Sequence, residues 1–137
     1  MKHELAVEWI KAAYADIIVL EKIVDDSFIT QMTSFHSQQS VEKSLKALLE
    51  YNSQKVPKKH DVLMLKDLVK DYIDIEDEDI LEDLNTLYID SRYPGDMGLL
   101  PNGKPTLQDA QIFYDFANNI FKEVCILLNI TIEDLKQ

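Results

Sequence analysis

FHSQQSVEKSLKALL, residues 35–49, decides the fold, because its apolar side chains recur at helical spacing. At about 100° of rotation per residue, one face collects Phe35, Val41, Leu45, Leu48 and Leu49. Gln38 and Glu42 fall inside that face. A buried polar side chain costs about 1–3 kcal/mol unless it is hydrogen-bonded. The stretch therefore predicts a core-facing helix whose polar residues either form an internal network or line a pocket.

Outside this helix, the same period continues along most of the chain. Glycine and proline interrupt it mainly in PGDMGLLPNGKP, residues 94–105, which holds all three glycines and three of the four prolines. We expect helices over about residues 3–24, 27–52, 61–72, 77–91 and 106–128. A short turn opened by a Thr131 capping box should follow. The sequence predicts a single domain, 1–137, folded as an all-α, up-and-down antiparallel bundle of four to five helices.

Several residues have expected places in this bundle. The first helix has an apolar stripe made of Ala6, Trp9, Ala13, Ile17, Leu20 and Val24. Asp16 is set inside the edge of that stripe. Asp61 is a natural N-cap for the third helix. Leu68 and Leu127 are expected on buried helix faces, and Cys125 is expected to pack in the core.

Charge and composition narrow the classes of function. The net charge of −11 argues against an extended nucleic-acid surface, which depends on many Lys and Arg contacts to phosphate. It leaves room for a small basic pocket, in which Arg92, the only arginine against thirteen lysines, offers the one guanidinium. With a single cysteine, no signal-peptide pattern and no membrane-length apolar run, we expect a cytoplasmic protein that does not associate with membranes.

No motif in the sequence predicts a cofactor, a metal or a catalytic residue. The glycines lack the spacing of a phosphate-binding loop. The His60-Asp61 pair resembles a metal-binding motif, but no further histidine cluster supports it, and entry into the third helix is the role we expect for it. His36 points away from the Leu45 face and is expected at the surface.

Polar residues from three predicted helices are expected to converge. They are Asp16 on the first helix, Gln38, Gln39, Glu42, Lys43 and Lys46 on the second, and Arg92 and Tyr93 where the fourth helix ends. One interpretation is a buried network that fixes helix register. The other is an anion or nucleotide site, in which Arg92 and a lysine bind phosphate and Gln38 or Gln39 contacts a base or sugar.

The combined pattern resembles a known family. FHSQQSVEKSLKALL, KKHD at 58–61 and SRYP at 91–94, together with Trp9 and Asp16, are similar to the HEPN domain (higher eukaryotes and prokaryotes nucleotide-binding). The resemblance implies a helical bundle, commonly a homodimer, often acting beside a minimal nucleotidyltransferase. The site residues that it implies are Asp16, Gln38, Gln39, Glu42, Lys43, His60 and Arg92.

One departure from the family bears on activity. Its ribonuclease branches carry an arginine followed by a histidine after four to six residues, whereas here the matching positions after Arg92 are Met97, Gly98 and Leu99. The leading hypothesis is therefore a nucleotide-binding or partner-binding accessory module. The alternative is a ribonuclease, or the toxin of a toxin–antitoxin pair, with a non-standard active site. In a third reading, the polar residues serve only to fix dimer register.

Overall fold

The computed structural model describes residues 2–90 and 103–136, which form a helical bundle without β-strands. Its longer helices are α1 (Lys2–Ile23), α2 (Thr30–Tyr51), α3 (Val62–Leu68), α4 (Glu78–Asp90) and α5 (Leu107–Leu127). The short elements are a 3-10 helix η1 (Ser27–Ile29) and α6 (Ile132–Leu135). The predicted all-α bundle is confirmed. No helix in the described part of the chain has the length and apolar character needed to cross a membrane.

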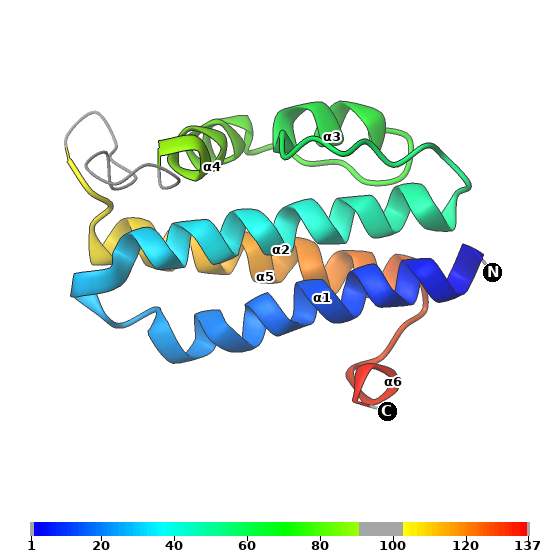
Figure 1. The fold of residues 1–137 in the computed structure, drawn as a ribbon, viewed down its shortest axis with the longest axis horizontal. Coiled ribbons are helices and arrows are strands. Elements are labelled where there is room, and N and C mark those ends of the chain that lie inside the picture. The colour runs from blue at the N-terminus through cyan, green and yellow to red at the C-terminus, as the bar shows by residue number, and fades with distance from the viewer. Residues whose placement is uncertain (1, 91–102, 137) are drawn as a thin grey trace.

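Helix α2 occupies the centre of the bundle (Figure 1). It runs antiparallel to α1, while α5 packs behind the pair and α3 and α4 lie along its other side. The hydroxyl of Thr30 donates to the carbonyl of Pro105 at 2.6 Å, which fixes the start of α2 beside the start of α5. Because α2 contacts four other helices, it has little solvent-exposed surface.

Small side chains allow α1 and α5 to approach α2 closely. The buried hydroxyl residues of α2 include Thr33, Ser37, Ser40 and Ser44. Ser40 donates to the carbonyl of Ala13 on α1 at 3.3 Å. Larger apolar residues of the same helix fill the remaining core: Val41, Leu45, Leu48 and Leu49, as expected from their spacing. The predicted core face of α2 is confirmed.

Capping residues set most of the helix starts. Asp26 accepts a hydrogen bond from the amide of Phe28 and begins η1, so the expected helix over 27–52 opens with a 3-10 turn and becomes α-helical only at Thr30. Thr106 and Thr131 each form a capping box, with Asp109 and Asp134 respectively. The predicted capping box at the last turn is thereby confirmed.

The expected burial of two leucines is wrong. Leu68 is exposed because α3 stops after two turns, well before residue 72, and Val62, Leu65 and Val69 make its buried contacts. Leu127 is exposed because Leu128, one position further round the helix end, faces the core instead. Cys125 is buried as predicted, and burial raises the pKa of its thiol to about 11.

Asp61 is the N-cap of α3, as predicted, and also joins α3 to α4. Its carboxylate accepts hydrogen bonds from the amides of Leu63 at 3.0 Å and Met64 at 3.1 Å. The side-chain amide of Asn85 on α4 donates to the same oxygen at 2.8 Å, and its carbonyl accepts from the amide of Val62 at 2.9 Å. This two-way contact holds the entry of α3 against α4.

The Asp61 contacts predict a pH-dependent contribution to stability. Partial burial acts to raise the pKa of Asp61, but the three hydrogen bonds and the charge of Lys59 outweigh it, and the pKa lies below its ordinary value of 3.8. The stabilisation is therefore present above that value and is lost as the pH falls through the lowered pKa. Urea unfolding at pH 7 should find Asp61→Asn less stable than the wild type by up to about 1 kcal/mol, after allowance for solvent screening.

At a pH below 3.8 this difference should shrink, because the unfolded chain takes up a proton there and the native carboxylate follows as the pH falls through its lowered pKa. Asp67→Asn is the matched control, since Asp67 is an exposed carboxylate of the same helix. An Asp61→Asn deficit that is the same at both pH values would show that the charge of Asp61 contributes nothing.

Candidate functional site

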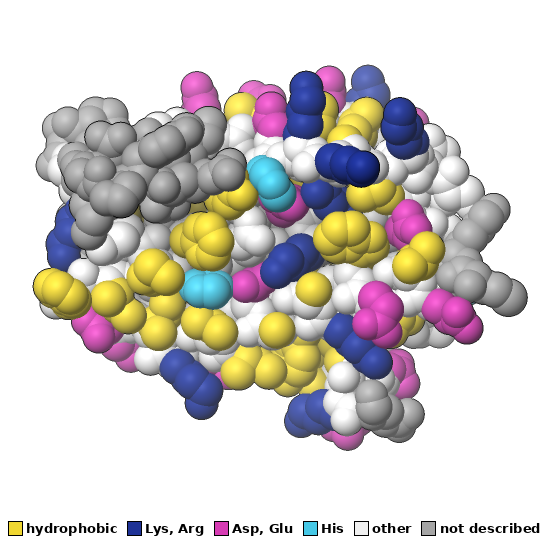
Figure 2. Space-filling view, viewed as in Figure 1, with side chains coloured by type: hydrophobic (Ala, Val, Ile, Leu, Met, Phe, Trp, Pro, Cys, Tyr) yellow, Lys and Arg dark blue, Asp and Glu magenta, His cyan; other side chains and the backbone are white. Residues whose placement is uncertain are grey.

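The charged and amide side chains in the middle of α2 are grouped on the side of the helix that lies between α1 and α4. On this face, histidine, lysine and acidic side chains gather over α2, with hydrophobic side chains around them (Figure 2). Two carboxylates, Asp16 on α1 and Glu42 on α2, organise the group. We refer to these residues together as the polar cluster: Asp16, His36, Gln38, Gln39, Glu42, Lys43, Lys46 and His60.

Glu42 is the more deeply buried carboxylate, with 5% of its side chain exposed. Lys46, one turn further along α2, donates to its Oε2 at 3.0 Å. The imidazole Nδ1 of His60, in the segment before α3, lies 3.0 and 3.1 Å from the two carboxylate oxygens. Because a buried carboxylate needs compensating charge and hydrogen bonds, Glu42 fixes both partners in place.

Lys46 is almost completely enclosed, since only 4% of its side chain is exposed. Its ammonium lies 5.4 Å from the centroid of the Trp9 ring on α1, in addition to its ion pair with Glu42. These two contacts leave Lys46 shielded from solvent, so its direct effect is on Glu42 and on the packing of α1 against α2.

Gln38 is fully buried and links three parts of the cluster. Its Nε2 donates to Glu42 Oε1 at 3.0 Å and to the backbone carbonyl of His60 at 3.1 Å. Its Oε1 accepts from Gln39 Nε2 at 2.7 Å. Both amide hydrogens of Gln38 are therefore engaged, whereas Gln39 is half-buried and lies nearer to solvent.

Asp16 repeats the arrangement at the α1–α2 boundary. Lys43 Nζ donates to Asp16 Oδ2 at 2.8 Å, and the imidazole Nδ1 of His36 lies 2.9 Å from Oδ1. Lys43 and His36 keep 25% and 21% of their side chains exposed. The lysine of this half, Lys43, is therefore more exposed to solvent than Lys46, the lysine of the Glu42 half.

Aromatic rings connect the two histidines. His36 meets the ring of Phe35 edge-on at 5.2 Å, and Phe35 stacks on Tyr88 of α4 at 5.7 Å between centroids. Tyr88 in turn lies 5.2 Å from the ring of His60. The row gives the cluster an apolar flank, of a kind on which a planar ring can stack.

The structure brings together seven of the nine residues predicted for the site. These are Asp16, Gln38, Gln39, Glu42, Lys43, Lys46 and His60. Arg92 and Tyr93 lie outside the described residues. No set of three or more His, Cys, Asp or Glu side chains within the described ranges is arranged to hold a metal ion.

The sequence-based interpretation expected His36 at the surface and did not include it in the site. The residue is half-buried and bonded to Asp16. The spacing places His36 on the same face of α2 as Lys43, two helical turns away, but it does not show that Asp16 of α1 lies opposite both.

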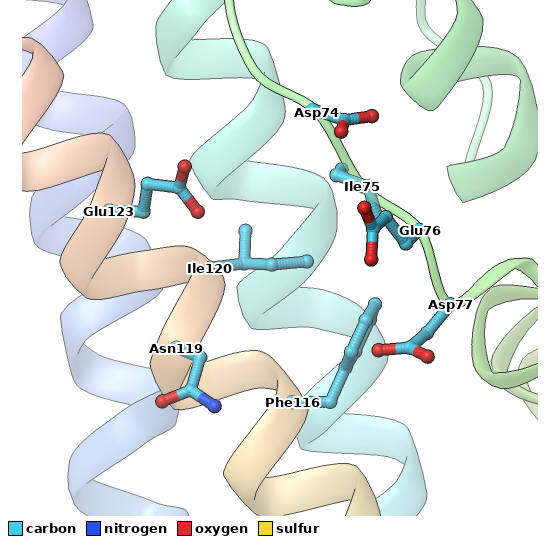
Figure 3. Close-up of a pocket in the computed structure, with 8 residues that line it drawn as sticks. All are labelled: Asp74, Ile75, Glu76, Asp77, Phe116, Asn119, Ile120 and Glu123. Carbon is cyan, nitrogen blue, oxygen red and sulfur yellow. The ribbon is translucent and has the colours of Figure 1, made fainter.

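A concavity lies away from the polar cluster, between α5 and the segment that joins α3 to α4 (Figure 3). It has a volume of about 410 Å³, and its lining includes four carboxylates, from Asp74, Glu76, Asp77 and Glu123. Phe116 and Ile120 of α5 supply apolar walls, and no Lys, Arg or His lines it. Negative charge in this hollow disfavours an anionic ligand.

The Glu42–Lys46 pair predicts a large effect of a nearly isosteric substitution. Glu42→Gln removes the charge opposite the enclosed ammonium of Lys46, so the free energy of unfolding in urea should fall by about 3–5 kcal/mol. Glu50→Gln is the matched control, because Glu50 lies on the same helix at a partly exposed position, and its effect should stay within about 0.5 kcal/mol. A Glu42→Gln loss below about 1 kcal/mol would contradict the central role of this carboxylate.

Comparison with known proteins identifies the family. A model of the HEPN domain matches residues 6–128, a span that contains the whole polar cluster. Neither a curated protein nor a solved structure matches the chain. The match supports a nucleotide-binding or ribonuclease-type module as the general class of function. Since it extends over most of a chain that folds as a helical bundle, the protein belongs to the HEPN domain family.

Proposed function

We propose that this protein is a nucleotide-binding accessory module whose ligand contacts the polar cluster. The observation that carries the proposal is that two buried carboxylates hold one partly exposed lysine and two histidines at the same face of α2. Cationic side chains and imidazoles that are fixed before a ligand arrives favour the binding of phosphate, because little side-chain freedom remains to be lost.

The residues divide into contacting and positioning roles. Lys43 uses one ammonium hydrogen on Asp16 and has two left for a phosphate oxygen. Gln39 lies close enough to solvent to contact a base or sugar. Gln38 and Lys46 are enclosed and would act by holding Glu42 and His60. We include Arg92 and Tyr93 in the proposed site on the sequence pattern, with Arg92, which the resemblance also implies, on phosphate.

Binding, not cleavage, is the activity we propose, because the sequence lacks the Arg-His pair that the resemblance links to ribonucleases. In this proposal the protein works as a homodimer together with a minimal nucleotidyltransferase, as the family pattern implies. Sedimentation of the purified protein tests the dimer, and copurification with a co-expressed nucleotidyltransferase tests the partner.

Calorimetric titration of ATP, GTP, AMP and a short RNA tests the site. Wild-type protein should bind at least one of them saturably. Lys43→Met should weaken that binding by about tenfold or more, because a charge-assisted hydrogen bond to phosphate contributes about 1.5–3 kcal/mol. Lys122→Met, at an exposed position of α5, is the matched control and should bind as the wild type does. Arg92→Ala is titrated alongside to test the residue implied by the resemblance.

Two results would overturn this proposal. The absence of heat with every ligand, in protein that is folded by circular dichroism, would leave the cluster as a purely structural network. Cleavage of the short RNA by wild-type protein, lost in Arg92→Ala, would instead favour the ribonuclease alternative.

A further inference from the structure

Both histidines of the polar cluster are held in the same way. In each, Nδ1 faces a carboxylate that also binds a lysine: Asp16 with Lys43 for His36, and Glu42 with Lys46 for His60. A carboxylate paired with an ammonium accepts hydrogen bonds and donates none. The hydrogen of each imidazole is therefore fixed on Nδ1.

The second nitrogen of each ring is then the one presented to a ligand. Nε2 points away from the carboxylate that holds Nδ1, and in neither histidine does it have a hydrogen-bond partner among the described residues. The His60 side chain is 46% exposed. In the neutral ring Nε2 is a lone-pair acceptor, which repels a phosphate oxygen, whereas in the charged ring it is a donor that attracts one.

The fixed charges around the imidazoles nearly cancel. Asp16 of α1 and Lys43 of α2 face His36, with Tyr88 of α4 beyond the Phe35 ring. Glu42 and Lys46 of α2 and the Tyr88 ring face His60, whose chain neighbours Lys59 and Asp61 also carry opposite charges. Two carboxylates and two lysines contribute no net charge to the cluster, so the protonation of the histidines decides how strongly it attracts an anion.

We infer that the cluster binds a phosphorylated ligand when both of its imidazoles, those of His60 and His36, are protonated. Ligand binding is therefore coupled to proton uptake by these two residues. This inference rests on the proposed function and specifies the state of the site that performs it. Nucleotide affinity should decrease as the pH rises above the range in which imidazole is charged. The decrease should approach about tenfold per pH unit for each proton taken up.

Calorimetry in two buffers tests the coupling directly. AMP and ATP are titrated into the full chain near pH 7, once in HEPES and once in Tris, which release protons with different enthalpies. If the complex takes up protons from the buffer, the observed binding enthalpy differs between the two buffers, and the difference is proportional to the number of protons taken up. The wild type should take up more protons than the double variant His36→Gln/His60→Gln, and affinity in the variant should depend less on pH.

His3→Gln is the control, because His3 stacks on Tyr51 at the other end of α2 and should leave proton uptake unchanged. Uptake of equal size in the double variant would assign the protons to the nucleotide phosphate and overturn the inference. Equal enthalpies in both buffers for wild-type protein would overturn it without any variant, while leaving nucleotide binding intact. Absence of heat from AMP, ATP, GTP and the short RNA, at pH 6 as well as near pH 7, would overturn the proposed function together with the inference.

Discussion

The carboxylate of Glu42 is the constraint on which the arrangement of this bundle depends. It lies on the core-facing side of the central helix, where an uncompensated charge would be strongly destabilising. Its compensation comes from three directions: along α2 from Gln38 and Lys46, and from His60 in the segment that leads into α3. Through Lys46 and the Trp9 ring the same charge also reaches α1. A single buried group therefore sets how three parts of the chain meet.

Asp16 makes a similar set of bonds, but at the boundary between two helices and closer to solvent. The two carboxylates bind partners of the same chemical kinds, a lysine and a histidine, but they differ in how far these partners are exposed to solvent. Of the two partners of Glu42, Lys46 is enclosed and only His60 is exposed to solvent. Both partners of Asp16, Lys43 and His36, are partly exposed and within reach of a ligand. Both halves therefore expose a group to solvent: His60 in the Glu42 half, and Lys43 and His36 in the Asp16 half.

Helical period was enough to predict the bundle, the core face of α2 and the presence of Gln38 and Glu42 within it. Those features depend only on the angle at which each residue projects from its own helix. The roles of Lys46 and His36 depend on which helix lies opposite: Trp9 encloses the first, and Asp16 draws in the second. Period along one helix carries no information about its neighbour, so these contacts could not be assigned from the sequence. The contacts that Asn85 of α4 makes with Asp61 and Val62 at the start of α3 have a similar origin.

The small hydroxyl residues along α2 have a practical consequence for work on this protein. The hydroxyls of Thr33, Ser37 and Ser44 are buried, and none has a hydrogen-bond partner within the described part of the chain. Alanine at position 37 or 44 would remove a buried hydroxyl that makes no hydrogen bond within the described part of the chain. Alanine also has a higher helix propensity than serine. Substitutions to alanine on the buried face of α2 should therefore raise the free energy of unfolding. A variant that carries such alanines should tolerate larger losses of stability from changes in the polar cluster and still remain folded.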